Sequence, residues 1–443
     1  MGSAIRKRFS WNHRCTTRFT PGARAGSRLD PDYIHFPPPL WGRVRVGGCL
    51  PVTPIGRDFA LILAARLLRA FGFGLAAVLV GLHLERRGLT AGAIGVVLTI
   101  GLLSAAISGV LAAALASRIG RRATLAAAGM LMTVAGADLA LATSPVLLGI
   151  AAVTGMLGAA SVDLGPFASI EQAALAESVE PSRRNVAFAR YSLTGGLAAA
   201  AGALLAGTAT NLDRGRLLFA LYAAIGLATA GLALLLSPRA EAPVRAAALS
   251  SAQIRALAPL SALFAIDALG GGLVVNAVIA YWLHVRFGAP ANVLGPAFAA
   301  IALLQAASYE VSGRLANRIG LIRTMVFTHI PSNVLLILVP LSPSLPWAIG
   351  LLLARFSLSQ MDVPARQAYV VSIVPPAERA GAVAFTGLVR GLGQALGPIV
   401  SGAAIQGAAL GLPFFLAGGL KLVYDLSLYA AFRSRRAEHE TLR

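Results

Sequence analysis

A series of long apolar stretches constrains this chain more than any other feature of its sequence. From Phe59 onward, each stretch approaches the roughly 20 residues that a helix needs to cross a hydrocarbon core about 30 Å thick. Lipid offers no hydrogen bonds to the backbone, so segments of this length must be helices. The sequence therefore predicts an all-α integral membrane protein with twelve transmembrane helices. The expected spans are 59–83, 90–115, 123–143, 145–170, 185–208, 216–236, 257–284, 291–313, 322–342, 346–371, 380–407 and 410–432.

Composition excludes the main alternatives. The chain is 57% hydrophobic and 13% charged, whereas soluble domains average roughly 25% charged residues. A soluble globule and a disordered chain are both ruled out. The formal net charge is nevertheless +20, and a basic balance of this size can indicate nucleic acid or an anionic membrane surface. Where the charges lie decides between these readings.

The first 57 residues differ from the rest. They hold ten basic residues against two acidic ones, and both cysteines, Cys15 and Cys49. No apolar core precedes a small-residue cleavage site, so the region is not a secretory signal peptide. We expect 1–57 to be a disordered basic and Pro-rich extension without function. The remainder has no cysteine, which excludes disulfides and cysteine metal sites there.

The distribution of Lys and Arg predicts the orientation. With the N-terminus inside, the loops expected in the cytoplasm hold eighteen arginines, Arg366 among them, and the opposite loops hold five. By the positive-inside rule both termini lie in the cytoplasm. Most of the positive charge is thus a topology signal, and nucleic acid is not an expected partner. We expect a multi-pass protein of a bacterial inner (plasma) membrane.

The sequence after residue 57 repeats itself. The loop after the second span has Gly120, and the similar loop after the eighth has Gly320, 200 residues later. Gly196, Gly202 and Gly207 are matched 195 residues later by Gly391, Gly397 and Gly402. We therefore expect two six-helix bundles, 58–237 and 257–443 with a short cytoplasmic tail, joined by a cytoplasmic linker at 238–256. Duplicated membrane halves indicate a transporter.

At these loops the sequence resembles the major facilitator superfamily. The family's Asp-Arg-x-Gly-Arg-Arg type turn is similar to the segment from Ser117 to Arg122, and more weakly to 317–323. The family's acidic residue is replaced in both copies. The resemblance implies two pseudo-symmetric bundles, transport by alternating access, and a gating loop. The expected gating-loop residues are Ser117, Arg118, Gly120, Arg121, Arg122, Asn317, Arg318 and Gly320.

A glycine and proline element occupies the eleventh span. Gly397, Pro398 and Gly402 resemble an element that exporters of the superfamily carry in the fifth helix. Small residues at this spacing also allow helices to approach closely. The element therefore favours efflux or marks helix packing, and both interpretations stay open.

Charged side chains inside the spans are the best candidates for a site, because each costs about 2.5 to 3.5 kcal/mol at the bilayer centre. Arg66 and Arg69 share one helical face. Glu171 follows a segment, 165–167, where the fourth helix is expected to break. Carboxylates in a low-dielectric cavity can carry coupling protons, and Asp163 and Asp267 are the best placed. The candidates are Arg66, Arg69, Asp163, Glu171, Arg190, Asp267, Glu310, Arg355, Asp362 and Arg390.

Five polar residues have a specific expectation of their own. Lys421 and Asp425, four residues apart, are expected to form a local ion pair. Arg355 and Asp362 are two turns apart on the expected tenth helix, too far for direct contact, so each should face another helix or an aqueous cavity. His329 is expected to be a packed polar residue rather than a proton carrier.

Together these features predict a secondary transporter of a small solute, proton-coupled and monomeric, with efflux favoured. One alternative is an organic-anion uptake symporter. The other is a non-transporting membrane sensor or scaffold, although no soluble signalling domain is evident. Enzymatic motifs are absent from the sequence, and we expect no catalytic residues, no metal and no cofactor. The expected partners are the solute, protons and lipid.

Overall fold

The computed structural model describes residues 56–144, 146–160, 165–178, 184–241, 250–374 and 379–432. The predicted disorder of the N-terminal extension lies outside these residues, apart from the last two. Residues 54–443 form one compact unit, and every regular element described in it is helical. The elements are α1 Arg57–Arg86, α2 Ala91–Ile119, α3 Arg121–Leu141, α4 Leu148–Val153, α5 Pro166–Ser178, α6 Arg184–Ala206, α7 Leu212–Leu234, η2 Pro238–Glu241, α8 Ser251–Leu273, α9 Asn276–Phe287, α10 Ala291–Ile319, α11 Leu321–Leu338, η3 Val339–Leu341, α12 Leu345–Leu358, α13 Asp362–Ser372, α14 Arg379–Ala395, α15 Gly397–Gln406 and α16 Leu412–Phe432.

The helices are those of a membrane protein. Among the described residues, nine segments are long and apolar enough to cross a bilayer. The other three expected spans correspond to α4 with α5, to α6, and to α12 with α13. Large apolar side chains on the outside of the bundle are exposed, such as Leu111 at 60% and Leu217 at 61%. Because such a surface is unfavourable in water, these side chains face lipid, and the predicted fold class is confirmed.

Several expected spans are divided rather than continuous. The break predicted near Gly165 is present, and it begins earlier, where Gly155 and Gly158 have φ values of 72° and 67°. The tenth and eleventh spans are interrupted just before Pro364 and Pro398. Proline has no backbone N–H group to donate to the preceding turn, which favours a break there. The seventh span divides after the glycine run 270–272, where helix propensity is low.

The groups freed at these breaks find partners in the opposite bundle. The amide of Ala277, just after the break between α8 and α9, donates to the carbonyl of Ala159 at 3.0 Å. The amide of Ile399, after Pro398, donates to Oγ1 of Thr99 at 2.9 Å. Backbone groups in a membrane must be satisfied inside the protein. The breaks are therefore tolerated because they meet across the interface.

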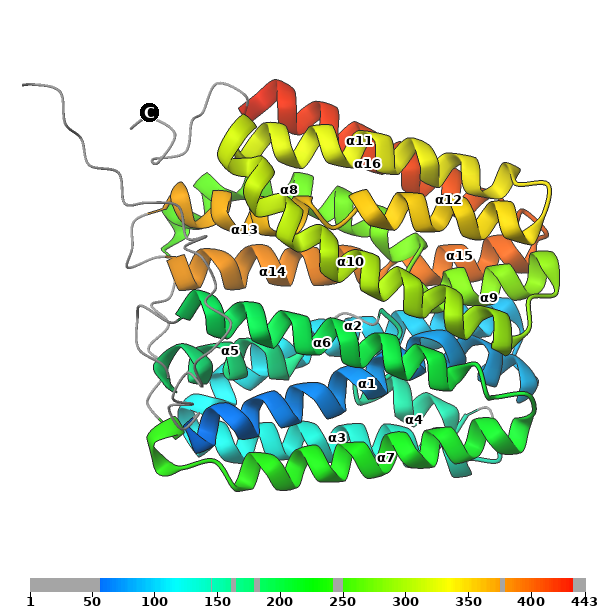
Figure 1. The fold of residues 1–443 in the computed structure, drawn as a ribbon, viewed down its shortest axis with the longest axis horizontal. Coiled ribbons are helices and arrows are strands. Elements are labelled where there is room, and N and C mark those ends of the chain that lie inside the picture. The colour runs from blue at the N-terminus through cyan, green and yellow to red at the C-terminus, as the bar shows by residue number, and fades with distance from the viewer. Residues whose placement is uncertain are drawn as a thin grey trace, which may run out of the picture. The chain divides into compact units, whose positions relative to one another are not determined.

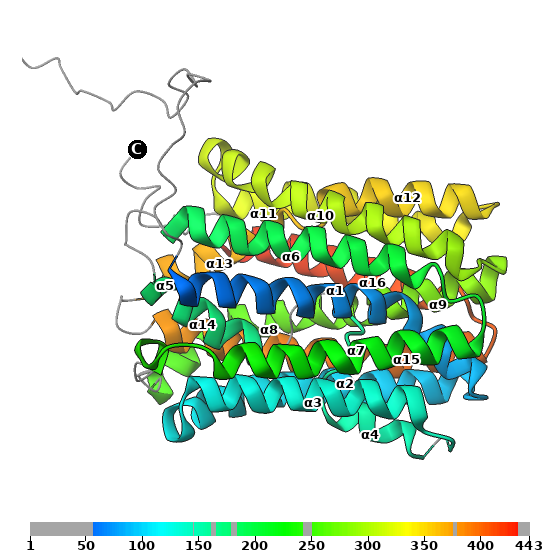
Figure 2. The same cartoon turned by 60° about the horizontal axis from the view of Figure 1, so that its bottom comes forward.

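We call α1–α7 the first bundle and α8–α16 the second bundle (Figure 1). Inside each bundle, glycine allows two helices to touch through their backbones. A Cβ atom on Gly202 of α6 would overlap the carbonyl oxygen of Phe71 in α1, which lies beside α6 in Figure 2. In the same way, a Cβ atom on Gly397 would overlap the backbone of Gly272 in α8. These two glycines are the pair that the sequence repeat matched.

The contacts between the bundles repeat as well. Gly196 of α6 lies against Ala306 of α10, and Gly391 of α14 lies against Ala106 of α2; in both, an added Cβ atom would be 2.8 Å from the alanine methyl. Further along, Gly402 approaches Ala91 and Gly95 of α2. The pairs α6 with α10 and α14–α15 with α2 are thus equivalent contacts, as expected of duplicated bundles.

Polar contacts join the bundles at the end where α1 finishes, which we call the Glu85 end. Glu85 accepts a hydrogen bond from the Tyr281 hydroxyl at 3.5 Å, and its carboxylate lies 3.3 Å from Nε2 of His284. Nearby, the amide of Gly92 donates to the side chain of Gln406 at 2.8 Å. The bundles are therefore fastened together at this end by both glycine contacts and hydrogen bonds.

Replacing Gly397 by Ala tests the backbone contact with α8. The added methyl group would overlap the backbone of Gly272, so α8 and α15 must separate, at a cost of about 1 to 3 kcal/mol. We expect a lower thermal unfolding midpoint in detergent. Gly419→Ala in α16 is the matched control, because nothing lies within 4 Å of its added Cβ. Equal midpoints for the two variants would contradict the packing argument.

Candidate functional site

The two repeated loops adopt the same backbone. Gly120 and Gly320 both have φ of 90°, with ψ of 160° and 163°. This left-handed region favours glycine, so the turn between adjacent helices requires it in both copies. Ser117, Arg118 and Arg318 are exposed. Asn317 lies in α10, and its side chain is outside the described part of the chain.

An acid that the sequence analysis missed caps the first loop. The Glu241 carboxylate accepts the amides of Arg121 at 2.6 Å and Arg122 at 3.3 Å. An anion is favourable at a helix N-terminus, where amides are unsatisfied and the helix dipole is positive. Glu241 is the only acid between 238 and 255. A single acid in this basic linker was the sequence feature that could have marked it as a partner of the loop. Glu241 places a carboxylate at the loop where the family's own acid is replaced.

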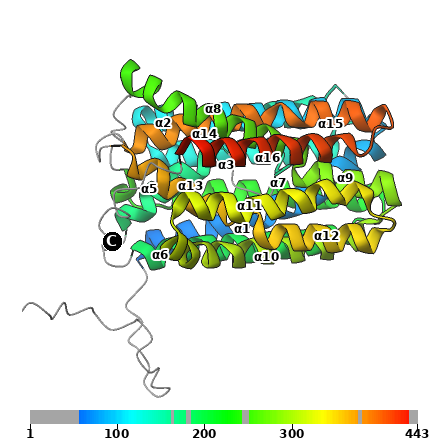
Figure 3. The same ribbon diagram turned by 90° about the horizontal axis from the view of Figure 1, so that it is seen from above.

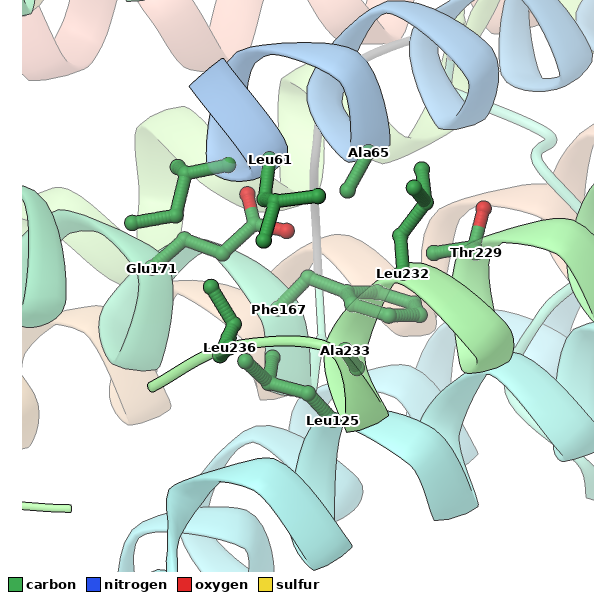
Figure 4. Close-up of a pocket in the computed structure, with 10 residues that line it drawn as sticks. Leu61, Ala65, Leu125, Phe167, Glu171, Thr229, Leu232, Ala233 and Leu236 are labelled. Atoms are coloured by element: carbon green, nitrogen blue, oxygen red, sulfur yellow. The ribbon is translucent and has the colours of Figure 1, made fainter. Parts of the chain in front are cut away.

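The first bundle contains a buried ion pair. Arg69, fully buried, donates to both carboxylate oxygens of Glu171 at 2.6 and 2.7 Å. The Tyr191 hydroxyl donates to the same carboxylate at 2.8 Å, and the Phe167 ring lies 4.3 Å from the guanidinium. Helices α1, α5 and α6 thus share one network. The cavity beside Glu171, shown in Figure 4, measures about 10 Å³, space for about one water molecule.

The remaining candidates of this region and Glu310 are placed as follows. The Arg66 guanidinium lies 4.7 Å from the Tyr191 ring and against Gly195. Arg190 is exposed. Asp163 is outside the described residues, and Glu310 of the second bundle lies in α10 with its side chain outside them. A role for these four remains a prediction.

The second bundle gathers four basic or imidazole side chains around Asp267 of α8. Its carboxylate lies 2.6 Å from Lys421, 2.8 Å from Arg390 and 3.6 Å from Arg366. Nε2 of His329 is 3.8 Å away. These partners come from α16, α14, α13 and α11, and Figure 3 shows α14 and α16 beside α8. The buried Asp267 carboxylate therefore links α8 to four other helices.

Asp425 has a separate set of partners. Its carboxylate lies 2.9 Å from Nδ1 of His329 and accepts from the Asn333 amide at 2.8 Å. The expected local pair between Lys421 and Asp425 is therefore wrong: each finds its partner on another helix. His329 is packed and buried, as expected, and it bridges two aspartates that are far apart in the sequence.

Arg355 and Asp362 are not on one continuous helix. Arg355 lies in the last turn of α12, and Asp362 is the first residue of α13. Asp362 accepts from Arg366 of its own helix at 2.7 Å, so its main partner is local rather than on another helix. Arg366 itself was counted as a loop residue in the orientation analysis; it is buried in the cluster. Removing it from that count leaves seventeen arginines against five, so the predicted orientation is the same.

A cavity of about 350 Å³ adjoins this cluster. Its wall includes Asp267, His329, Arg355 and Arg390, with Ala160 contributed by the first bundle. Ligand pockets are commonly this large or larger. The cavities found among the described residues of the first bundle are far smaller, about 10 and 20 Å³, so the second bundle holds the candidate solute site.

The two ion pairs are related by the sequence repeat with their charges exchanged. The 195-residue offset that matches Gly202 to Gly397 also matches Glu171 to Arg366. Gly74 and Gly272, both on backbone contacts of α1 and α8, are 198 residues apart, as are Arg69 and Asp267. The first bundle thus has a cation on its first span and an acid on its fourth. The second bundle has the reverse.

Sequence reasoning found part of these clusters. Arg69, Glu171, Asp267, Asp362 and Arg390 were candidates, and the structure brings them into two networks. The candidate Arg355 lines the cavity beside the second network. Sequence reasoning missed the roles of Tyr191, Asn333 and Arg366. A signal existed for Arg366, because it is the repeat partner of the candidate Glu171. Among the described residues no group of His, Cys, Asp and Glu could hold a metal ion.

The membrane-spanning helices form two repeated bundles, and a cavity lined by charged side chains lies beside the interrupted helices. These features define a transport protein of the two-bundle class. The sequence pattern of the Major Facilitator Superfamily matches residues 62–353 and 260–443. The chain belongs to this family.

A relative and two solved structures illustrate the similarity. The uncharacterized membrane protein YJR124C of Saccharomyces cerevisiae is 26% identical over 421 residues, covering 85% of this chain and 94% of that protein. The nucleoside transporter NupG has a TM-score of 0.66 at 15% identity, covering 85% of this chain and 99% of its own. A D-xylose-proton symporter has a TM-score of 0.65 at 15% identity, covering 84% and 97%. At these identities the solved structures show the fold alone.

A paired substitution tests the first-bundle ion pair. Arg69→Met leaves the Glu171 charge buried without its partner, which costs about 3 to 5 kcal/mol. The double variant Arg69→Met with Glu171→Leu removes both charges and should recover most of that loss. The measurement is the thermal unfolding midpoint of each variant in detergent. Additive losses in the double variant would contradict the pairing.

Proposed function

We propose that this member of the superfamily is a secondary transporter that couples a small solute to protons. The solute site is the second-bundle cavity, and Asp267 is the coupling carboxylate. The observation that carries the proposal is the position of Asp267, buried in the cavity wall and in contact with cations from three other helices. The D-xylose-proton symporter of the same fold is consistent with this proposal.

The coupling follows from the charge of Asp267. While ionised, it attracts Lys421 and Arg390 and so holds α8, α16 and α14 together. Protonation removes the negative charge, and buried cations left without a counter-charge are strongly unfavourable. Proton loading would therefore release these helices from one another. His329 provides a contact from Asp267 to Asp425, so a proton has a second acceptor nearby.

Alternating access requires an interface that can open at either end. The hydrogen bonds of Glu85 and Gln406 and the contacts of Gly402 close the Glu85 end. We propose that these contacts separate when the opposite end closes. The loops of Gly120 and Gly320 lie at that opposite end, and their gating role stays part of the proposal.

Orientation and environment are also proposed from the sequence. The excess of arginine in the loops on the side of Gly120 supports cytoplasmic termini, in the inner membrane of a bacterium. We propose a monomer without nucleic-acid partners, organised as the two bundles and linker of the sequence analysis. The exposed apolar surface fits a lipid environment.

The sequence favours export as the direction of transport, but the structure offers another explanation for the residues that suggested it. Gly397 and Gly402 lie on backbone contacts with α8 and α2, so helix packing accounts for the element that favoured efflux. The direction of coupled proton movement separates export by antiport from uptake by symport. A sensor or scaffold would move neither solute nor proton.

Asp267→Asn tests the coupling. Full-length protein is reconstituted in liposomes with an internal pH indicator, and solutes that stabilise it in detergent are applied outside. We expect solute-driven proton movement in the wild type, none in Asp267→Asn, and partial movement in Asp267→Glu, which retains a titratable group. The control is Asp213→Asn, whose carboxylate is exposed at the surface.

Two results would count against this mechanism. Unchanged proton movement in a folded Asp267→Asn variant excludes Asp267 as the coupling group. No movement of solute or proton with any stabilising solute in the wild type favours the sensor or scaffold alternative. Size-exclusion profiles confirm that each variant remains folded before the flux is interpreted.

A further inference from the structure

Arg355 stands apart from the other cations of the cavity. It is 6% exposed and lines the cavity wall. Its Nε and Nη1 atoms have no hydrogen-bond partner within the described residues. Ser359, one turn further on and 5% exposed, lines the same cavity, and its hydroxyl also lacks a partner there. Buried polar groups are rarely left unsatisfied in native proteins, so this pair needs an explanation.

The structure holds Arg355 in place without using these donors. The Cζ atom of its guanidinium lies over the Phe356 ring, 4.5 Å from the ring centre. Its backbone carbonyl accepts from the amide of Ser359 at 2.9 Å and from the hydroxyl of Ser332 at 3.4 Å. The guanidinium is therefore positioned by the Phe356 ring and by the backbone of its own turn, which leaves Nε and Nη1 available to a ligand.

The charges of the cluster do not balance. Each of its carboxylates already has a partner: Asp267 has Lys421 and Arg390, Asp362 has Arg366, and Asp425 has His329. Leaving His329 out of the count, the four cations Lys421, Arg390, Arg366 and Arg355 exceed the three carboxylates by one. Arg355 is the cation with no carboxylate within ion-pair distance among the described residues. A buried charge without a counter-charge is unfavourable, so the site is suited to an anion.

We propose that Arg355 and Ser359 bind an anionic oxygen group of the transported solute, a carboxylate or a phosphate. The guanidinium supplies the charge and planar donors suited to such groups, and the hydroxyl supplies one further donor. Amide side chains of Gln305 and Gln394 line the same cavity and are placed to contact the rest of the solute. This inference rests on the proposed transporter function and deepens it by naming the class of solute.

Matched pairs of anionic and neutral probes test the proposal. Benzoate, succinate and glucose 6-phosphate are compared with benzamide, succinamide and glucose at millimolar concentration, by their effect on the thermal unfolding midpoint of the full chain in detergent. We expect at least one anion to stabilise the protein while its neutral counterpart does not. The carboxylate and phosphate pairs distinguish the two chemistries. Equal effects within every pair, or no stabilisation by any anion, would overturn the proposal.

Variants assign the binding to this site. Arg355→Met should weaken the anion's Kd about 10- to 100-fold, and Ser359→Ala about 2- to 10-fold, since a hydrogen bond to a charged group is stronger than a neutral one. Arg286→Gln, at the end of α9 and away from the cavity wall, should leave the Kd unchanged. An unchanged Kd in Arg355→Met would place the anion elsewhere and refute the assignment.

A ligand-free measurement separates a binding role from a structural one. Arg355→Met removes a buried charge that has no counter-charge, so its unfolding midpoint should equal or exceed that of the wild type. Arg366→Met breaks the contacts with Asp362 and Asp267 and should lower it. A loss in Arg355→Met as large as that in Arg366→Met would show that Arg355 is a structural ion-pair partner and overturn the proposal.

The outcomes also separate this inference from the coupling mechanism. If proton movement depends on Asp267 while neutral and anionic probes bind alike, the transporter proposal stands and the anion proposal fails. If anions bind through Arg355 and no proton moves, the coupling proposal fails and the binding site stands.

Discussion

Direct backbone contact at glycine is the interaction on which this structure depends. Helices in lipid are not driven together by the hydrophobic effect, so their association relies on close packing and hydrogen bonds. Gly202 and Gly397 provide that contact inside the two bundles, and between the bundles Gly196 and Gly391 each lie against an alanine methyl group. Because the same contacts occur twice, equivalent positions of the two bundles have equivalent surroundings. The arrangement of the charged side chains follows from this symmetry.

Within that symmetric frame the charges make the bundles different. Arg69 pairs with Glu171 in the first bundle, and the equivalent positions, Asp267 and Arg366, carry the opposite signs in the second. In the first pair the Tyr191 hydroxyl also donates to Glu171, and the cavity beside it is about 10 Å³. The second pair adjoins a cavity of about 350 Å³. A duplicated fold thus holds one compact structural network and one cluster next to a solute-sized space.

The sequence predicted the helices and the repeat well, and the partners poorly. Hydropathy located α1, α2 and α16 within a few residues, since crossing a bilayer sets both length and composition. The pair of Lys421 and Asp425 was wrong because helical spacing shows which residues could meet and not which have better partners nearby. Arg366 lies inside the expected span 346–371 and was still counted with the loop arginines, because a charge near the end of an apolar run gives no local sign that it is buried against Asp267 of another helix. Contacts between distant segments leave no local signal.

By itself, the sequence determined that this chain spans a membrane many times, that its halves are duplicated, and which few charges lie within the spans. These follow from local physics: backbone hydrogen bonds in lipid and the cost of burying charge. Only the tertiary structure decided that Asp267 has three cations around it and that Arg355 has no carboxylate within ion-pair distance in the described part of the chain. Such pairings depend on which helices meet, and in this chain that is set by glycine contacts between segments more than 100 residues apart in the sequence.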